Sequence, residues 1–244
     1  MMKSPHYNYY DHNHESKKNA DQAIDLGRQR LNPQLSDPNY LAYYFRKQIL
    51  AGWIQNIGKQ QLYILDVGGR IQPYRELFES RTHSYIAIDP IYEGLVNIVA
   101  LGEHLPVRSS HFDIVLCTQV LVYANNPIRF ASELHRVLKP GGSLLLTTPA
   151  FFPNYHDELW RFFPLSLRKL LGSFSSIQIV PEGHSVSGFI RITCIFLDII
   201  VKNSTLHKML TRIVFPVLNK LGKKFDTLSD NNQMSTNYSC LAVK

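Results

Sequence analysis

The residues best suited to ligand chemistry follow two short apolar runs in the first half of the chain. Asp66 and the paired glycines Gly68 and Gly69 end the run 62–67, and Asp89 closes the next run. Glycines carry no side chain, so a turn built from them can approach a ligand closely. A carboxylate at Asp89 can accept hydrogen bonds from both hydroxyls of a ribose. These residues predict a site for a nucleotide-like ligand, although a plain strand-to-helix turn would use the same glycines.

Alternating strand and helix patterns must position these residues. Strands are predicted at 62–67, 84–88, 95–99, 111–117, 143–147, 174–180 and 236–243. Helices are predicted at 40–57, 73–79, 127–138 and 165–171, and the first of these has an expected apolar face of Leu41, Tyr44, Phe45, Ile49 and Trp53. This alternation predicts βαβ units and a mostly parallel sheet, whose ligands bind at the carboxyl ends of the strands.

Composition and charge exclude several classes of protein. The chain has 244 residues, 45% of them hydrophobic, which is enough for one α/β domain with a core. Its net charge of +7 comes almost entirely from six basic residues between Asp198 and Asp226. The charge is therefore local, and we expect no nucleic-acid partner. No cysteine pair or regular ligand spacing indicates a metal site.

The ends of the chain differ from its middle. Residues 1–27 are polar without a hydrophobic period and predict a flexible N-terminal tail before a domain at 28–244. Three widely separated cysteines and no secretory signal predict reduced thiols in a cytoplasmic protein. The longest apolar stretch, 192–201, is too short to span a bilayer.

Four stretches carry a resemblance to a known family. They are Ile64 to Gly69, Tyr85 to Pro90, Gly102 through Leu121, and Glu133 to Pro149. On these stretches, and most specifically on the last two at their spacing, the chain from about residue 28 resembles the class I S-adenosylmethionine-dependent methyltransferases. Within that class it is similar to the small-molecule group called type 11.

The resemblance implies a Rossmann-like, mostly parallel seven-stranded sheet with an antiparallel last strand and a helical insertion. It also implies S-adenosylmethionine as cofactor, held through residues that match the family's motif positions. The implied cofactor-binding residues are Asp66, Gly68, Gly69, Arg70, Asp89, Leu101, Gly102, Glu103, Thr118 and Gln119.

The chain departs from the family at three motif positions. Arg70 and Gln72 stand where the family usually has glycines, and Leu101 stands where it often has an acid. Arg70 could donate charge-assisted hydrogen bonds to the cofactor carboxylate, or it could narrow the pocket. These departures motivate an alternative function, a catalytically weak or inactive cofactor-binding or regulatory protein. A nicotinamide-dependent oxidoreductase is poorly supported, because the dinucleotide glycine pattern is absent.

The predicted reaction is methyl transfer to a small-molecule or glycan-type acceptor by in-line displacement, in which the enzyme mainly positions the reactants. A hydroxyl acceptor would use a general base. His156 and Asp157 follow the fifth strand and Tyr123 follows the fourth, so these three are the candidate catalytic residues at the acceptor edge. A surface-loop histidine is an equally good interpretation of His156.

The stretch 189–221 is predicted to be helical. Its apolar residues recur at helical spacing between Leu206 and Leu221, with basic residues interspersed and Pro216 expected to kink it. We expect a lid over the acceptor site, because such stripes usually face a core. The alternative is peripheral contact of 206–224 with an anionic membrane surface, which would make the cytoplasmic protein membrane-peripheral.

Overall fold

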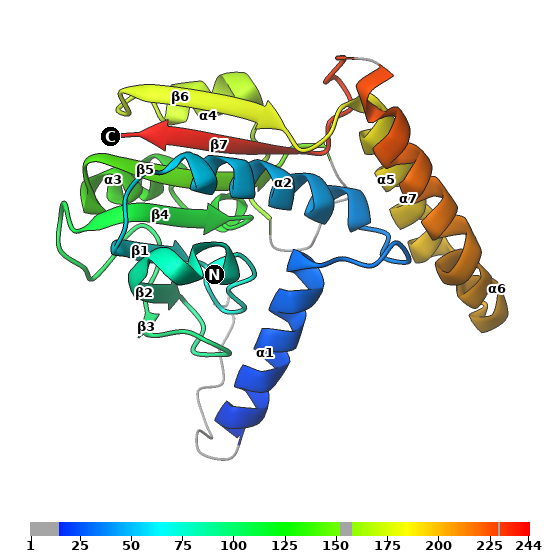
Figure 1. Ribbon diagram of the computed structural model, residues 1–244, viewed down its shortest axis with the longest axis horizontal. Helices are drawn as coiled ribbons and strands as arrows, with labels where there is room; N and C mark the ends of the chain where they lie inside the picture. Colours follow the sequence, from blue (N-terminus) through cyan, green and yellow to red (C-terminus); the bar gives the residue numbers. More distant parts are fainter. Residues whose placement is uncertain (1–14, 152–157, 229) are drawn as a thin grey trace, which may run out of the picture.

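A computed structural model describes residues 15–151, 158–228 and 230–244 as an α/β fold around one twisted sheet (Figure 1). The sheet has seven strands in the order β3-β2-β1-β4-β5-β7-β6. Only β7 runs antiparallel to its neighbours β5 and β6. The bounds are β1 Leu62–Val67, β2 Thr82–Asp89, β3 Ile98–Val99, β4 Phe112–Thr118, β5 Leu138–Pro149, β6 Ser176–Pro181 and β7 Asn237–Val243. The predicted fold class is confirmed.

Helices cover both faces of the sheet because the central strands are apolar on both sides. Leu65 and Val67 of β1 pack in one cluster with α3 (Pro127–Val137) and α4 (Pro164–Leu170). Leu62 and Ile64 pack in a second cluster with α2 (Tyr40–Asn56) and the 3₁₀ helix η1 (Arg75–Arg81). Alternate residues of a strand point to opposite faces, so β1 contributes to both layers of the core.

Several element bounds differ from the sequence predictions. β5 begins at Leu138 rather than 143, and β3 is a two-residue strand rather than 95–99. The predicted helix 73–79 is the 3₁₀ helix η1. A second short 3₁₀ helix, η2 (Leu121–Tyr123), follows the end of β4.

The predicted tail is wrong over its second half. Residues Glu15–Leu31 form helix α1, and Ala23 and Leu31 are buried. A Cβ on Gly27 would lie 2.3 Å from the carbonyl oxygen of Ile71, so α1 approaches the segment after the glycine turn closely. The helix was missed because its buried positions, Ala23, Gly27 and Leu31, include only one large apolar side chain. Residues 1–14 lie outside the described part of the chain.

The predicted helical stretch 189–221 is a helical hairpin. It consists of α5 (Ser185–Ile200), α6 (Ser204–Met209), the π-helical turn η3 (Leu210–Val214) and α7 (Phe215–Phe225), followed by η4 (Asp226–Leu228). The irregular turn η3 comes just before Pro216, which has no N–H to continue the helical pattern. Figure 1 shows the hairpin extending away from the sheet, with α2 beside its base. No helix in the described residues is long and apolar enough to cross a membrane.

Candidate cofactor and acceptor site

The glycine turn after β1 has a backbone geometry that requires glycine. Gly68 has φ +84°, in the left-handed region, and a Cβ there would lie 2.1 Å from Cγ2 of Val120. The backbone N–H groups of Gly68 and Gly69 donate to the carbonyl oxygen of Ile88 at 2.7 and 3.3 Å. The turn is therefore tied to the carboxyl end of β2, which brings it next to Asp89.

Asp66 lies beneath this turn and is buried. Its Oδ2 accepts a hydrogen bond from the Tyr85 hydroxyl at 2.7 Å, and a Cβ on Gly69 would lie 2.9 Å from its Cγ. Burial raises the pKa of Asp66 to about 6, the Tyr85 hydrogen bond opposes this shift, and the charge of Asp89 adds to it. Asp66 is thus placed to support the turn rather than to line a pocket.

Asp89, at the end of β2, is covered by Arg70. Asp89 accepts the backbone N–H of Ile91 at 3.0 Å, and its Oδ2 lies 3.4 Å from Nε of Arg70. The other side of the guanidinium reaches Glu93, also at 3.4 Å. Burial raises the pKa of Asp89, whereas the Ile91 N–H and Arg70 lower it. Arg70 therefore bridges two acids in this state of the protein.

A pocket with a volume of about 310 Å³ opens between the glycine turn and α1. One wall is Gly68, Arg70, Ile71, Glu93 and Gly94, and the other is Asn19, Gln22, Ala23, Leu26 and Arg30 of α1. This volume is at the lower end of the range for small-molecule sites. Four residues that the sequence assigned to a flexible tail, Asn19, Gln22, Ala23 and Leu26, thus form most of one pocket wall.

The segment after β3 divides into an exposed and a buried part. Leu101 is 48% exposed, whereas a Cβ on Gly102 would lie 2.0 Å from the Phe130 ring. The buried Glu103 accepts the backbone N–H groups of Asn125 and Asn126 at 2.7 and 3.3 Å. Glu103 therefore anchors the start of α3, and its carboxylate already has partners within the protein.

The acceptor edge begins where β4 ends. Gln119 follows Thr118 with φ +62°, and its amide hydrogen-bonds both Thr147 Oγ1 and Asn237 Nδ2 at 3.0 Å. Tyr123, at the end of η2, is 47% exposed. His156 and Asp157 lie outside the described residues, so their predicted catalytic role stays a prediction.

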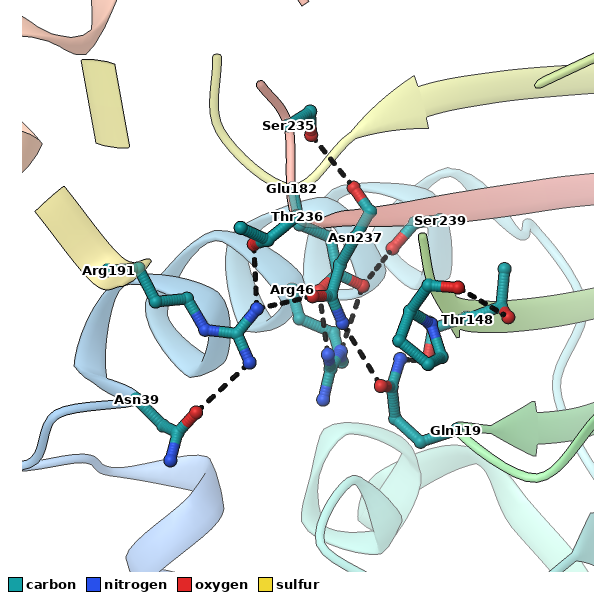
Figure 2. Close-up of polar contacts among 12 residues, drawn as sticks. Asn39, Arg46, Gln119, Thr148, Glu182, Arg191, Ser235, Thr236, Asn237 and Ser239 are labelled. Atoms are coloured by element: carbon teal, nitrogen blue, oxygen red, sulfur yellow. Dashed lines mark hydrogen bonds and ion pairs between the residues drawn. The ribbon is translucent and has the colours of Figure 1, made fainter. Parts of the chain in front are cut away.

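The structure also reveals a buried polar network that sequence reasoning missed (Figure 2). Arg46 of α2 donates from Nε and Nη2 to the Glu182 carboxylate at 2.8 and 2.7 Å, and Ser239 donates to the same carboxylate at 2.8 Å. Burial lowers the pKa of Arg46, but the charges and hydrogen bonds of Glu182 and Tyr74 together outweigh this effect, so the net shift is upward. The pair is 136 residues apart in sequence, so no local pattern could indicate it.

A second part of this network joins the hairpin to the acceptor edge. Arg191 of α5 donates to Thr236 Oγ1 at 2.6 Å, to Asn237 Oδ1, and to Asn39 Oδ1 at 3.0 Å. Because Asn237 also bonds Gln119, the chain of contacts runs from the base of the hairpin to the end of β4 (Figure 2). The hairpin is thus held at its base by polar contacts as well as by packing.

No grouping of three or more His, Cys, Asp or Glu side chains that could hold a metal occurs among the described residues. The three cysteines are unpaired and buried. The pocket lining supplies the Glu93 carboxylate, the Arg70 guanidinium and the Gly68 backbone, and the Asp89 carboxylate lies directly behind Arg70. This donor set fits S-adenosylmethionine, whose ribose, carboxylate and methionine portion call for these three kinds of contact.

Comparisons with known proteins agree with this arrangement. Residues 65–146 match a family model described as a methyltransferase domain. The tRNA U34 carboxymethyltransferase of Campylobacter curvus is 31% identical over 87 residues, which are 36% of this chain and 27% of that protein. The mitochondrial ubiquinone biosynthesis O-methyltransferase of Rattus norvegicus is 32% identical over 80 residues, 32% of this chain and 23% of that protein. The chain therefore spans about a quarter of the length of these relatives.

Among solved structures, phosphoethanolamine N-methyltransferase 2 of Haemonchus contortus in complex with S-adenosyl-L-methionine has the same fold. The TM-score is 0.53 at 16% identity, and the match covers 89% of this chain and 60% of that one. The matched family model, the strand order and the glycine turn agree: residues 65–146 of this chain match a methyltransferase domain, set in a fold that class I S-adenosylmethionine-dependent methyltransferases share.

Proposed function

We propose that this chain transfers a methyl group from S-adenosylmethionine to a small-molecule or glycan-type acceptor. The observation that carries the proposal is the joining of Gly68 to the end of β2, which sets the glycine turn beside Asp89 under the cover of α1. Arg70 lines the pocket, and Asp89 behind it would hold the ribose hydroxyls once the guanidinium moves aside. The backbone of Gly68 would follow the methionine portion.

When bound, the cofactor supplies a methyl group activated by a positively charged sulfur. In the transfer, a bond forms between the methyl carbon and the acceptor atom as the carbon–sulfur bond breaks, and its electron pair stays on sulfur. The protein positions the acceptor and excludes water. An acceptor hydroxyl must also lose its proton, and His156, Asp157 and Tyr123 are the side chains that we propose for this step.

Two features support a small or glycan-type acceptor. Gln119 brings an uncharged amide to the acceptor edge, where the buried Thr147 and Asn237 hold it in place, and an amide suits hydroxyl-bearing molecules. The basic residues are instead concentrated on the hairpin. A nucleic-acid substrate would call for Lys and Arg side chains that contact its phosphates up to the acceptor edge. The three buried, unpaired cysteines agree with the reducing environment of the cytoplasm, which we propose as the location.

The test is a methyl-transfer assay that detects S-adenosylhomocysteine. Purified protein is given S-adenosylmethionine with panels of monosaccharides, small phenols and unmodified tRNA transcripts, after calorimetry has measured cofactor affinity. Product from a sugar or small hydroxyl compound supports the proposal, and product from tRNA alone would overturn the acceptor class. Absence of cofactor binding at millimolar concentration would overturn the whole proposal.

A catalytically weak or inactive cofactor-binding protein is the second candidate, and the Arg70–Asp89 pair motivates it, because displacing the guanidinium takes part of the cofactor's binding energy. The same calorimetry separates the two functions. Tight binding with no product across the whole panel would favour the binding protein.

A further inference from the structure

The hairpin, residues 185–225, keeps an apolar stripe on its surface after its own core has formed. Its core is built on Cys194 of α5 with Leu210 and Phe215, and Val214 and Leu218 pack against these residues. The outer stripe, which is exposed, consists of Leu206, Met209, Ile213, Val217 and Leu221. Its members recur every three or four residues and are 40–60% exposed, so they form one face along the second arm of the hairpin, residues 204–225. The predicted stripe is therefore divided, and its exposed half contradicts the expectation that the whole stripe faces a core.

The charge of this arm is of one sign. No acidic residue occurs from 199 to 225, whereas six basic residues do: Lys202, Lys208, Arg212, Lys220, Lys223 and Lys224. All six are exposed, and none forms an ion pair with an acid in the described part of the chain. One basic side chain, Lys223, also covers the ring of Tyr44 at 4.3 Å. The surface is thus positive and apolar together.

The arm is held in its helical form before any partner binds. Asn203 caps α6 by accepting the backbone N–H groups of Thr205 and Leu206 at 3.0 and 3.1 Å. Across the hairpin turn, His207 Nε2 lies 2.9 Å from Asp198 Oδ1. A surface that is already folded loses little conformational entropy on binding.

We propose that the outer stripe docks the protein on an anionic lipid bilayer, with its apolar residues in the headgroup region and its basic residues against the lipid phosphates. This combination of an apolar face with Lys and Arg is what interfacial helices use. A second copy of the chain is disfavoured because two such arms would bring like charges together. The phosphates of a nucleic acid would contact the Lys and Arg side chains but would leave the apolar stripe exposed to water.

The position of the hairpin gives docking a consequence for the acceptor edge. α5 begins at Ser185, close after β6 ends at Pro181, and Arg191 ties it to Asn237. A hairpin bound to lipid therefore tethers this edge of the sheet to the bilayer. The docking itself does not depend on methyl transfer, so it is tested without any activity measurement.

The test is sedimentation of the full chain with vesicles of phosphatidylcholine alone or mixed with phosphatidylglycerol. One variant, Lys208→Gln/Arg212→Gln/Lys220→Gln, removes charge, and a second, Ile213→Ser/Val217→Ser, removes apolar surface. We expect binding only to the mixed vesicles, weakened by salt, and weakened by about fivefold for each basic side chain removed. The apolar variant should also lose at least tenfold in affinity, because two aliphatic side chains no longer leave water on docking.

Control variants carry one substitution of each kind on exposed residues outside the hairpin, Ile128→Ser for the apolar change and Lys169→Gln for the charge change. Both should bind like the wild type, and melting temperatures verify that every variant is folded. Wild-type protein that fails to sediment with mixed vesicles at low salt would overturn the proposal. Full binding by the apolar variant would also overturn it, because the arm would then be a general polyanion site, as an acidic protein partner would use.

Discussion

Nε of Arg70 lies 3.4 Å from Oδ2 of Asp89, and the guanidinium also reaches Glu93. Arg70 is nearly half exposed, so solvent screens the pair and it is worth at most about 1 kcal/mol. A ribose that offers two hydroxyl donors to Asp89 can therefore displace the guanidinium. The departure of Arg70 from the family's glycine is thus compatible with cofactor binding.

This relationship predicts unequal effects of two substitutions on cofactor affinity. Asp89→Asn should weaken S-adenosylmethionine binding by about 1–3 kcal/mol, because charge-assisted hydrogen bonds are lost. Arg70→Ala should change it by no more than about 1 kcal/mol, because only a screened pair is removed. Titration calorimetry measures both. A loss at Arg70→Ala as large as that at Asp89→Asn would instead make Arg70 a direct cofactor contact.

Asp66 predicts a defined pH dependence of stability. Its pKa is 3.8 in the unfolded chain and about 6 in the folded protein, so the folded state binds this proton more strongly. The stabilisation is fully present below about pH 4 and is lost as the pH rises through 6. Relative to Asp66→Asn, the wild type should lose up to about 3 kcal/mol of unfolding free energy over this window.

Urea unfolding at a series of pH values measures this difference for Asp66. Tyr85→Phe serves as the companion variant, because removing its hydrogen bond to the carboxylate should move the loss to higher pH. If the wild-type and Asp66→Asn curves stay parallel from pH 4 to about 7, this carboxyl has no raised pKa.

The buried Arg46–Glu182 pair predicts a large stability effect from substitutions far from the pocket. Arg46→Met should destabilise the fold by about 3–5 kcal/mol, because it leaves the Glu182 charge buried without its partner. Replacing both residues, as Arg46→Met/Glu182→Leu, should recover much of that loss. Denaturant unfolding of the single and double variants gives the coupling energy. Additive losses would show that the two charges are independently solvated.

A side chain at Gly68 should destabilise the fold by clashing with Val120, and a smaller residue at position 120 should relieve that clash. Gly68→Ala should destabilise the protein by about 1–3 kcal/mol, because the backbone has a positive φ and the new Cβ would meet Val120. Val120→Ala in the same chain should relieve the steric part but not the backbone part. Thermal unfolding reports both.

A second glycine provides the control for Gly68→Ala. Gly52, in the middle of α2, has open space where a Cβ would lie, with no neighbouring atom within 4 Å, so Gly52→Ala should stabilise the helix by about 0.5–1 kcal/mol. Equal effects at the two glycines would mean that the turn does not require its left-handed conformation.

The sequence by itself determined the sheet and the glycine turn. The apolar strands of β1 and β4 are buried on both faces, so their composition alone identifies them, and Gly68 and Asp89 follow such strands directly. Element ends were less well determined, as at β5, because the residues that end a helix can also begin a strand.

Only the tertiary structure decided which helix faces are buried. In α2 the predicted face of Tyr44, Phe45 and Ile49 is not the most buried one, which instead contains Arg46 and Leu50. An arginine interrupts the apolar pattern, and its burial depends on Glu182, a residue from the far end of the chain. In the hairpin, the opposite happened: apolar residues such as Ile213 stay exposed, because α5 can cover only one side of the second arm. A local pattern reports which residues are apolar, whereas the partners that cover them come from distant parts of the sequence.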